Sequence, residues 1–493
     1  MKIVKIFLIG FLLQVNNVVL AENLSLQQVL QRVINHYPSI KSAAIQVQRA
    51  RQENIKVQSQ LSWALNTNAA YARETSLFGT PSDRYSIAGS VNKNLGSGGA
   101  LGLNASVARE DSEDSFGPTF PNPLTKTRID INYRHRFEKG ADNPLYQEGL
   151  VSAQAGETLA ISEKLALYDN LAAQVIDLYV SAATTRARIN SINKTIERGN
   201  RLKKYIDDEY RLGLSEEKDV LQVNARLSIN AADKKSLQVI WQQQLISLNR
   251  LMGRKWSEEL KPDTGAAPIV NMGFEKIYTQ TQNHSPALKT IDARLELADS
   301  AIRSSRDLTK DELDLVVFLG NEVNQGDRLL DDLDESTLVG GISLEYNRGL
   351  DKSGLNAALR QAHYDRGIAL QDKKQLLEDL QYDIASLLAE IESSEQALAA
   401  FSASVKAEKK KLDEAIIRYK DGRIETDRII EFESQLAVAE LSYDLQAIEL
   451  SRRYYLLNLL RGATWENMYF PDFNFSEYED NHQQSSRQQE STQ

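Results

Sequence analysis

The chain carries two copies of one pattern, and this duplication restricts its fold more than any other feature of the sequence. The segment YRLGLSEEKDVLQ begins at Tyr210, and YKDGRIETDRIIE begins at Tyr419, 209 residues later. The same offset carries Gly253 onto Gly462. A register that holds from Tyr210 to Gly253 predicts two structural repeats with the same elements in the same order.

A second pair of segments marks the start of each copy. NHYPSIK begins at Asn35 and NHSPALK begins at Asn283, 248 residues later. The offset falls from 248 to 209 between the two matches, so the first copy contains 39 additional residues. Because the helical segments that follow keep their register, we place the additional residues in the strand-like part of the first copy.

Proline positions indicate where the long helices lie. No proline occurs between Pro144 and Pro262 or between Pro286 and Pro471, and both intervals are rich in Ala, Leu, Gln, Glu and Lys. These residues favour helix. In each copy we expect an opening, a very long and a closing helix, at about 25–61, 143–211 and 215–252, and at about 274–309, 352–420 and 425–461.

The helix lengths predict extended rods that need neighbours. A helix of about 69 residues extends about 100 Å, and two helices of about 37 residues placed end to end match that length. We expect such helices to pack as antiparallel coiled coils. Rods of this kind bury their apolar faces only against lateral neighbours, so we expect an oligomer.

Strand-like patterns fill the segment before each long helix, at about 62–137 and 313–347. Apolar residues alternate there with small or polar ones, in four runs in the first copy and two in the second, with turns such as GTPSD, GSGG and GPTFPNP. A membrane β-barrel requires this alternation. A soluble sheet with one wet face shows it as well, so the local pattern leaves both structures open.

The N-terminus and the composition indicate export. Lys2 and Lys5 precede the apolar run IFLIGFLL, and Val19 and Ala21 provide the small-residue positions of a cleavage site, so we expect a secretory signal peptide over 1–21. The chain has no cysteine, which excludes disulfides and a lipid on cysteine. The net charge is −10 and basic residues are interspersed with acidic ones, which argues against a nucleic-acid partner.

The sequence shows no pattern typical of an enzyme or a metal site. LGSGGALG, from Leu95, lacks the lysine of a phosphate-binding loop and leads into a strand-like run. His36 and His284 recur in the two copies, but neither has a carboxylate or a second histidine at ligand spacing. With no Gly-x-Ser-x-Gly, cysteine nucleophile or clustered acid–base pair, we expect no catalysis, no cofactor and no metal.

Five segments, in this order, give the chain a family resemblance over about 24–465: LSLQQVLQRVINHYPSIKSA, FEKGADNP, YRLGLSEEKDVL, YNRGLDKSG and YKDGRIETDRII. They resemble the TolC-like family of outer-membrane efflux and secretion channels. The resemblance implies a mainly α fold with a membrane β-barrel. Three copies of an internally duplicated chain would form an α-barrel of long antiparallel helices, joined to a shared β-barrel. It also implies four barrel strands per chain, with six as the alternative.

The resemblance implies where functional residues lie. The turns between long and closing helices would be the periplasmic tips, where the channel narrows and an adaptor protein docks; they contain Gly213, Leu214, Ser215 and Gly422. At both glycines we expect a positive φ where a helix ends. Asp219 matches an aspartate of the network that closes the channel, and Tyr419 matches the gate tyrosine.

Two further tip positions depart from the family pattern. The gate arginine falls on Ile424 by strict register, and Arg423, one place earlier, is the candidate substitute. Glu431 matches a position that contributes an acidic ring at the aperture, whereas Arg428 replaces another acidic position there. The expected gating residues are therefore Asp219, Tyr419, Arg423 and Glu431.

The expected organisation is a signal peptide over 1–21, a first repeat over 22–253, a linker over 254–273, a second repeat over 274–465 and a polar disordered tail over 466–493.

We expect a passive exit duct of a tripartite efflux pump or a type I secretion system, in the outer membrane and extending into the periplasm. Its expected partners are two further copies of the chain, a periplasmic adaptor, an inner-membrane transporter that supplies energy, and outer-membrane lipid. The rival expectation is a soluble periplasmic coiled-coil scaffold or adaptor. The cargo stays open among drugs, proteins and polysaccharides.

Overall fold

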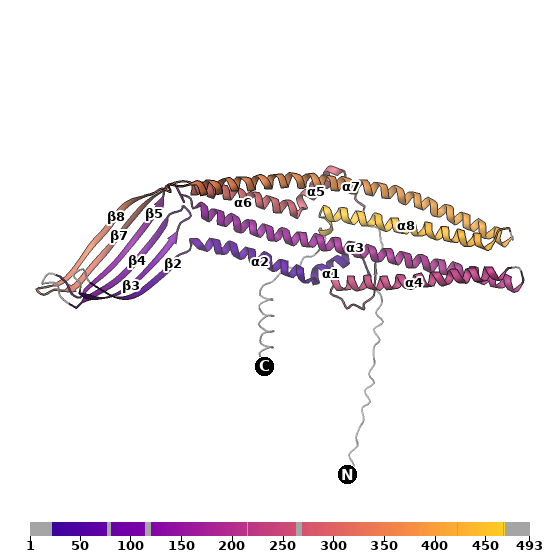
Figure 1. Ribbon diagram of the computed structural model, residues 1–493, viewed down its shortest axis with the longest axis horizontal. Helices are drawn as coiled ribbons and strands as arrows, with labels where there is room; N and C mark the ends of the chain where they lie inside the picture. Colours follow the sequence, from indigo (N-terminus) through magenta and orange to yellow (C-terminus); the bar gives the residue numbers. More distant parts are fainter. Residues whose placement is uncertain are drawn as a thin grey trace, which may run out of the picture. The chain divides into compact units, whose positions relative to one another are not determined.

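The computed structural model (Figure 1) describes residues 22–466 and 468, apart from 76–79, 114–119, 214, 263–268 and 422. The expected signal peptide and nearly all of the expected tail lie outside the described residues. The chain divides into two compact units. Unit 1 contains Met1–Ser42, Ala166–Ser285 and Glu378–Gln493, and unit 2 contains Ala43–Leu165 and Pro286–Leu377.

The two repeats contain the same helices at nearly the same lengths. The long helices have 68 residues each, the closing helices 35 each and the first opening helices 11 each. These matching lengths support a chain built from two copies of one unit. The pairs are α1 (Leu26–His36) with α5 (Phe274–His284), α2 (Pro38–Gln58) with α6 (Pro286–Leu308), α3 (Pro144–Arg211) with α7 (Ser353–Lys420), and α4 (Glu217–Leu251) with α8 (Thr426–Leu460).

Each opening segment is interrupted at its proline, so the expectation of one helix over 25–61 and one over 274–309 is wrong in this detail. Tyr37 has an extended backbone with ψ 121°, and Ser285 has ψ 112°. A proline ring clashes with the preceding residue when that residue is helical. The residues before Pro38 and Pro286 therefore leave the helix, and each proline starts a new one.

The start of α1 and its buried face anchor the core of unit 1. The Ser25 hydroxyl accepts a hydrogen bond from the Gln28 amide at 3.3 Å, and the Gln28 side chain accepts one from the Ser25 amide at 2.9 Å. This reciprocal capping fixes the first turn. The buried side chains of α1 recur every three or four residues, so they form one face; they are Leu26, Val29, Leu30, Val33 and Ile34.

That face packs against α3 and α4, beside a short two-stranded sheet. The core cluster includes Val175 and Ile176 of α3 and Leu248 of α4. Strand β1 (Glu22–Leu24) runs parallel to β6 (Leu260–Pro262). Among the helices that the structure describes, none is both long enough and apolar enough to cross a membrane.

Unit 2 contains a six-stranded antiparallel sheet with the order β2-β3-β4-β5-β7-β8 (Figure 1). The first repeat supplies four strands and the second supplies two, so the expectation of four strands per chain is wrong and the alternative of six is confirmed. The additional residues of the first copy form an additional hairpin. The strands are β2 (Ala64–Thr75), β3 (Pro81–Asn94), β4 (Ala100–Ser112), β5 (Leu124–Arg136), β7 (Glu312–Asp327) and β8 (Asp332–Asn347).

The register gives the sheet one apolar face and one polar face. Ile131 of β5 lies opposite Leu319 of β7 on the apolar face, and Asp130 lies opposite Gly320 on the polar face. The apolar side chains are exposed in this chain: Ile342 is 77% exposed and Leu338 is 75% exposed. An exposed apolar face of this extent, continuous over six strands, is typical of a surface that another molecule covers.

Candidate functional site: the helix tips and the strand–helix joint

An apolar cluster joins the ends of four helices in unit 1. The ring of Tyr205 on α3 lies 5.4 Å from the ring of Tyr419 on α7, with the planes tilted by 55°. Aromatic pairs attract each other at this distance. The contact therefore ties the α3–α4 hairpin to the α7–α8 hairpin. The buried side chains of the cluster are Leu202, Ile206, Val223, Ala415 and Ile429.

Tyr419 also holds the start of α8. Its hydroxyl lies 2.9 Å from the hydroxyl of Thr426, the first residue of α8, which is buried. Burial raises the pKa of Tyr419, and the carboxylates of Asp219 and Glu209 raise it further. The phenol is therefore neutral at physiological pH. Two of the expected gate residues, Tyr419 and Asp219, lie within electrostatic reach of each other.

Asp219 caps its own helix. Its carboxylate accepts hydrogen bonds from the Ser215 hydroxyl and from the Glu216 amide, both at 3.2 Å. A carboxylate in the first turn of a helix also interacts favourably with the helix dipole. In the single chain, Asp219 therefore stabilises the turn that starts α4.

The other two expected gate residues have different surroundings. Arg423 is exposed, and its side chain has no hydrogen-bond or ion-pair partner among the described residues. Glu431 accepts hydrogen bonds from Arg428 at 2.9 Å and from Gln435 at 3.1 Å. Arg428 lies one helical turn before Glu431 and forms an exposed ion pair with the carboxylate that the family resemblance assigns to an acidic ring.

The tip turns are described only in part. Gly213 has φ +74°, which confirms the expected positive φ after α3. Leu214 and Gly422 lie outside the described residues. The exposed apolar side chains of Leu212 and Leu221 flank the first turn.

Charged residues that are partly buried between α3 and α8 were missed by the sequence analysis. The Arg198 guanidinium lies 3.3 Å from the Glu440 carboxylate, and its side chain is 14% exposed. Burial raises the pKa of Glu433, while Arg198 and Arg201 act to lower it. In sequence these residues read as a solvated helix face. Which charges become buried depends on the packing of α3 against α8.

We expect Glu433→Gln to raise the melting temperature of the protein at pH 7. The raised pKa means that ionised Glu433 opposes folding, so wild-type stability falls as pH rises from the ordinary glutamate range through the folded pKa. The amide does not ionise, so the difference between the proteins should shrink as pH falls toward 4.5 in calorimetric melts. Glu392→Gln, on the exposed face of α7, is the control and should show no such pH dependence. A lower melting temperature for Glu433→Gln at pH 7 would contradict the assignment.

The turn between β3 and β4 packs on the joint that leads from β5 to α3. The Asp142 amide donates a hydrogen bond to the Ser97 carbonyl at 3.1 Å. Gly98 has φ +83°, and a Cβ at this position would overlap the carbonyl oxygen of Gly140. LGSGGALG therefore contains a docking turn and runs directly into β4, as the sequence analysis expected of a strand-like run.

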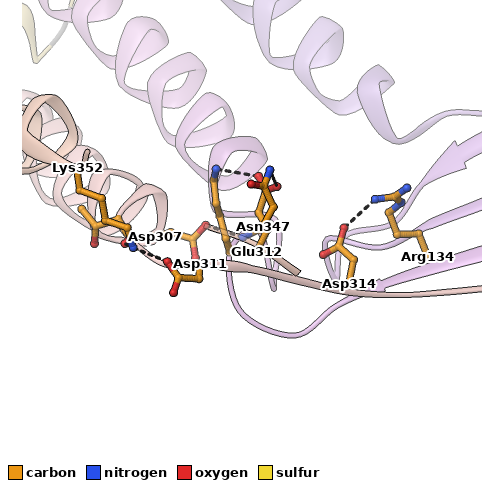
Figure 2. Close-up of polar contacts among 10 residues, drawn as sticks. Arg134, Asp307, Asp311, Glu312, Asp314, Asn347 and Lys352 are labelled. Atoms are coloured by element: carbon orange, nitrogen blue, oxygen red, sulfur yellow. Dashed lines mark hydrogen bonds and ion pairs between the residues drawn. The ribbon is translucent and has the colours of Figure 1, made fainter. Parts of the chain in front are cut away.

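A polar network holds the strand–helix joints of both repeats to the end of α6 and to the segment between α6 and β7. Figure 2 shows Asp307, Asp311 and Lys352 in this network. The Gly140 amide donates to the Asp307 carboxylate at 2.7 Å. The Lys352 ammonium donates to the Thr309 carbonyl at 2.7 Å and to the Asp311 carboxylate at 2.5 Å, and it is the main cause of the lowered pKa of Asp311. The joints of both repeats are therefore held by the same short stretch of chain, from Asp307 to Asp311.

The recurring histidines pack on the recurring glycines. His36 contacts the position that a Cβ of Gly253 would fill, and His284 does the same at Gly462. His284 also lies 3.2 Å from both oxygens of Asp169, a carboxylate that is distant in sequence. The sequence could not show this partner, because Asp169 is 115 residues away. No group of three metal-ligating side chains occurs among the described residues.

Solved structures share this architecture. No protein-family model matches the chain, and no curated protein matches it in sequence. The outer-membrane channel OprN is 16% identical with a TM-score of 0.61, covering 89% of each chain. VceC from Vibrio cholerae is 16% identical with a TM-score of 0.61, covering 89% of this chain and 95% of VceC. The CmeC outer-membrane channel from Campylobacter jejuni is 13% identical with a TM-score of 0.61, covering 92% of this chain and 88% of CmeC. The chain therefore has the fold of these outer-membrane channels, as its resemblance to the TolC-like family predicts.

Proposed function

We propose that the chain forms a channel of the outer membrane that extends into the periplasm and serves as the exit duct of an efflux pump or a type I secretion system. Three copies would close a β-barrel from their sheets and an α-barrel from their long helices. The duct conducts passively, and an inner-membrane transporter joined through a periplasmic adaptor supplies the energy. The shared fold supports the proposal.

The exposed apolar face of the sheet carries this proposal. Along β2, Leu65 is 71% exposed, and along β8, Ile342 is 77% exposed, while the opposite face carries Asn66, Asn104 and Asp130. A transmembrane barrel presents apolar side chains to lipid and polar ones to its lumen. A soluble scaffold would leave the apolar face in water, at a cost that scales with its area.

Planar bilayers test this function directly. Purified protein is expected to give discrete channels with a small closed-state conductance, because the tips narrow the path, and to fractionate with outer membranes. A protein that forms no channels and fractionates as soluble would instead support the periplasmic scaffold.

We propose that the contacts of Tyr419 keep the tips closed. The Tyr205 ring contact and the Thr426 hydrogen bond join the two hairpins and the start of α8. Tyr419→Leu removes both, and a loss of about 1 kcal/mol raises the open population about five-fold. Single-channel recording should show this increase.

Tyr210→Leu is the matched control for the gate. Tyr210 also lies near the end of α3 but is 46% exposed, so its replacement should leave the open probability unchanged. Equal effects of the two substitutions would show that Tyr419 has no specific role in the gate, and the proposed duct function would still stand.

A further inference from the structure

The sheet in unit 2 ends in two strands that can accept further strands. Within the described residues, β2 pairs only with β3, and β8 pairs only with β7. Unpaired strand edges tend to recruit another strand, and a membrane barrel removes its edges by closure. The β8 edge of one copy and the β2 edge of the next are therefore the surfaces through which copies can close.

The middle of β2, β3 and β4 carries small uncharged side chains on the polar face. Register places Asn66 opposite Ser90, and Ser90 opposite Asn104. The next row contains Asn68, Ala88 and Ser106. Small side chains on the inner wall leave more open space than long ones do. The middle of this part of the sheet is therefore hydrophilic and carries short side chains.

Charged side chains of the polar face lie along β5, β7 and β8, and three more, Glu74, Arg84 and Glu110, lie on β2, β3 and β4 beside the C-terminal end of β2. Figure 2 shows the Arg134 guanidinium directed at Asp314, 2.9 Å away, and Arg134 also lies 3.2 Å from Glu345. Arg128 pairs with Asp130 at 2.9 Å, and Asp130 is 8% exposed. These charges on β5, β7 and β8 pair with one another, so they neither form a ring of one sign nor extend far from the sheet.

We infer that this duct has a wide exit barrel that passes bulky hydrophilic solutes, an inference that rests on the proposed function. Three copies of a six-stranded sheet make 18 strands. With strands about 4.8 Å apart and tilted by about 40°, 18 strands enclose a backbone diameter of about 36 Å, against about 24 Å for 12 strands. Barrels of 16–18 strands hold an aqueous channel.

The additional hairpin is a fixed part of this barrel. The β3–β4 turn docks on the joint before α3 through Ser97 and Gly98. On its other side β4 pairs with β5 from Ala100 to Glu110. The hairpin therefore lies within the sheet, and its strands add to the circumference of the barrel.

Cross-linking between the β2 and β8 edges counts the copies that close the barrel. The chain has no cysteine, so an introduced pair reports a single contact. Asn68→Cys on the β2 edge is combined, one variant at a time, with Thr337→Cys, Val339→Cys, Gly341→Cys or Ser343→Cys on the β8 edge; all lie on the polar face. After oxidation we expect covalent species that end at three copies. Ser90→Cys on the interior strand β3 replaces Asn68→Cys as the control and should give none.

Exclusion of neutral polymers of graded size measures the width of the exit barrel. Neutral polyethylene glycols of graded size are added to the extracellular side of protein in planar bilayers, and those with radii up to about 10 Å are expected to enter and lower the conductance. Cross-linked species that end at two copies, or exclusion of polymers above about 5 Å in radius, would overturn the wide barrel and leave the duct function standing. Absence of any channel would overturn the duct function itself.

Discussion

Gly98→Ala is expected to destabilise the protein by about 3–5 kcal/mol, within the range of backbone strain combined with steric overlap. Gly98 has φ +83°, which costs an L-residue about 1–2 kcal/mol. The added Cβ would also overlap the carbonyl oxygen of Gly140, which is backbone and has no rotamer to change. The turn would have to move away from the joint and lose the hydrogen bond from Asp142 to Ser97. The amount of folded protein in outer membranes and its melting temperature by circular dichroism would measure the loss.

Gly96→Ala separates this contact from a general effect of alanine in the turn. Gly96 lies in the same turn, has no positive φ, and a Cβ there meets nothing within 4 Å. We expect it to melt close to wild type. If Gly98→Ala melted at the same temperature as Gly96→Ala, the turn would not dock on the joint.

The long helices could be predicted from the sequence because their determinants are local. Proline-free intervals and apolar residues every three or four positions set α3 at 143–211, and it runs Pro144–Arg211. The break before Pro38 was also locally determined, since a proline acts on the residue before it. Pro38 and Pro286 recur at this position in the two copies and mark the same break in each.

The number of strands shows how pattern and resemblance can disagree. The alternation marked six runs, and the sheet has six strands, whereas the family resemblance implied four. Alternation reflects which side chains face which side of a sheet, and this holds for every strand in it. The resemblance rested on turns and helix joints, which do not report how many hairpins lie between them.

The contacts of the candidate site depended on tertiary packing. Tyr419 could be singled out from the family resemblance, but its partner Tyr205 lies on α3, more than 200 residues earlier. Arg198 and Glu433 read as solvated charges until α3 and α8 are packed together. Periodicity tells which face of a helix is buried, and it does not tell which helix covers that face.

The recurrence of histidine and glycine in both repeats has a steric explanation. Gly253 and Gly462 have φ +68° and +77°, and the ring of the recurring histidine covers each of them. At Gly462 a Cβ would lie 2.6 Å from Nδ1 of His284, whereas at Gly253 it would lie 3.1 Å from Cβ of His36. Asp169 holds the His284 ring in place through Nε2, so that ring has less freedom to move away.

Gly462→Ala is therefore expected to destabilise the protein by about 2–4 kcal/mol, and Gly253→Ala by less. The double variant His284→Ala/Gly462→Ala removes the overlap but keeps the backbone strain of about 1–2 kcal/mol. In a double-mutant cycle of unfolding free energies, the loss of stability in the double variant should be smaller than the sum of the losses in the single variants by at least about 1 kcal/mol. Strict additivity would mean that His284 and Gly462 do not restrict each other. The repeated motif would then mark shared ancestry of the two copies without a shared packing constraint.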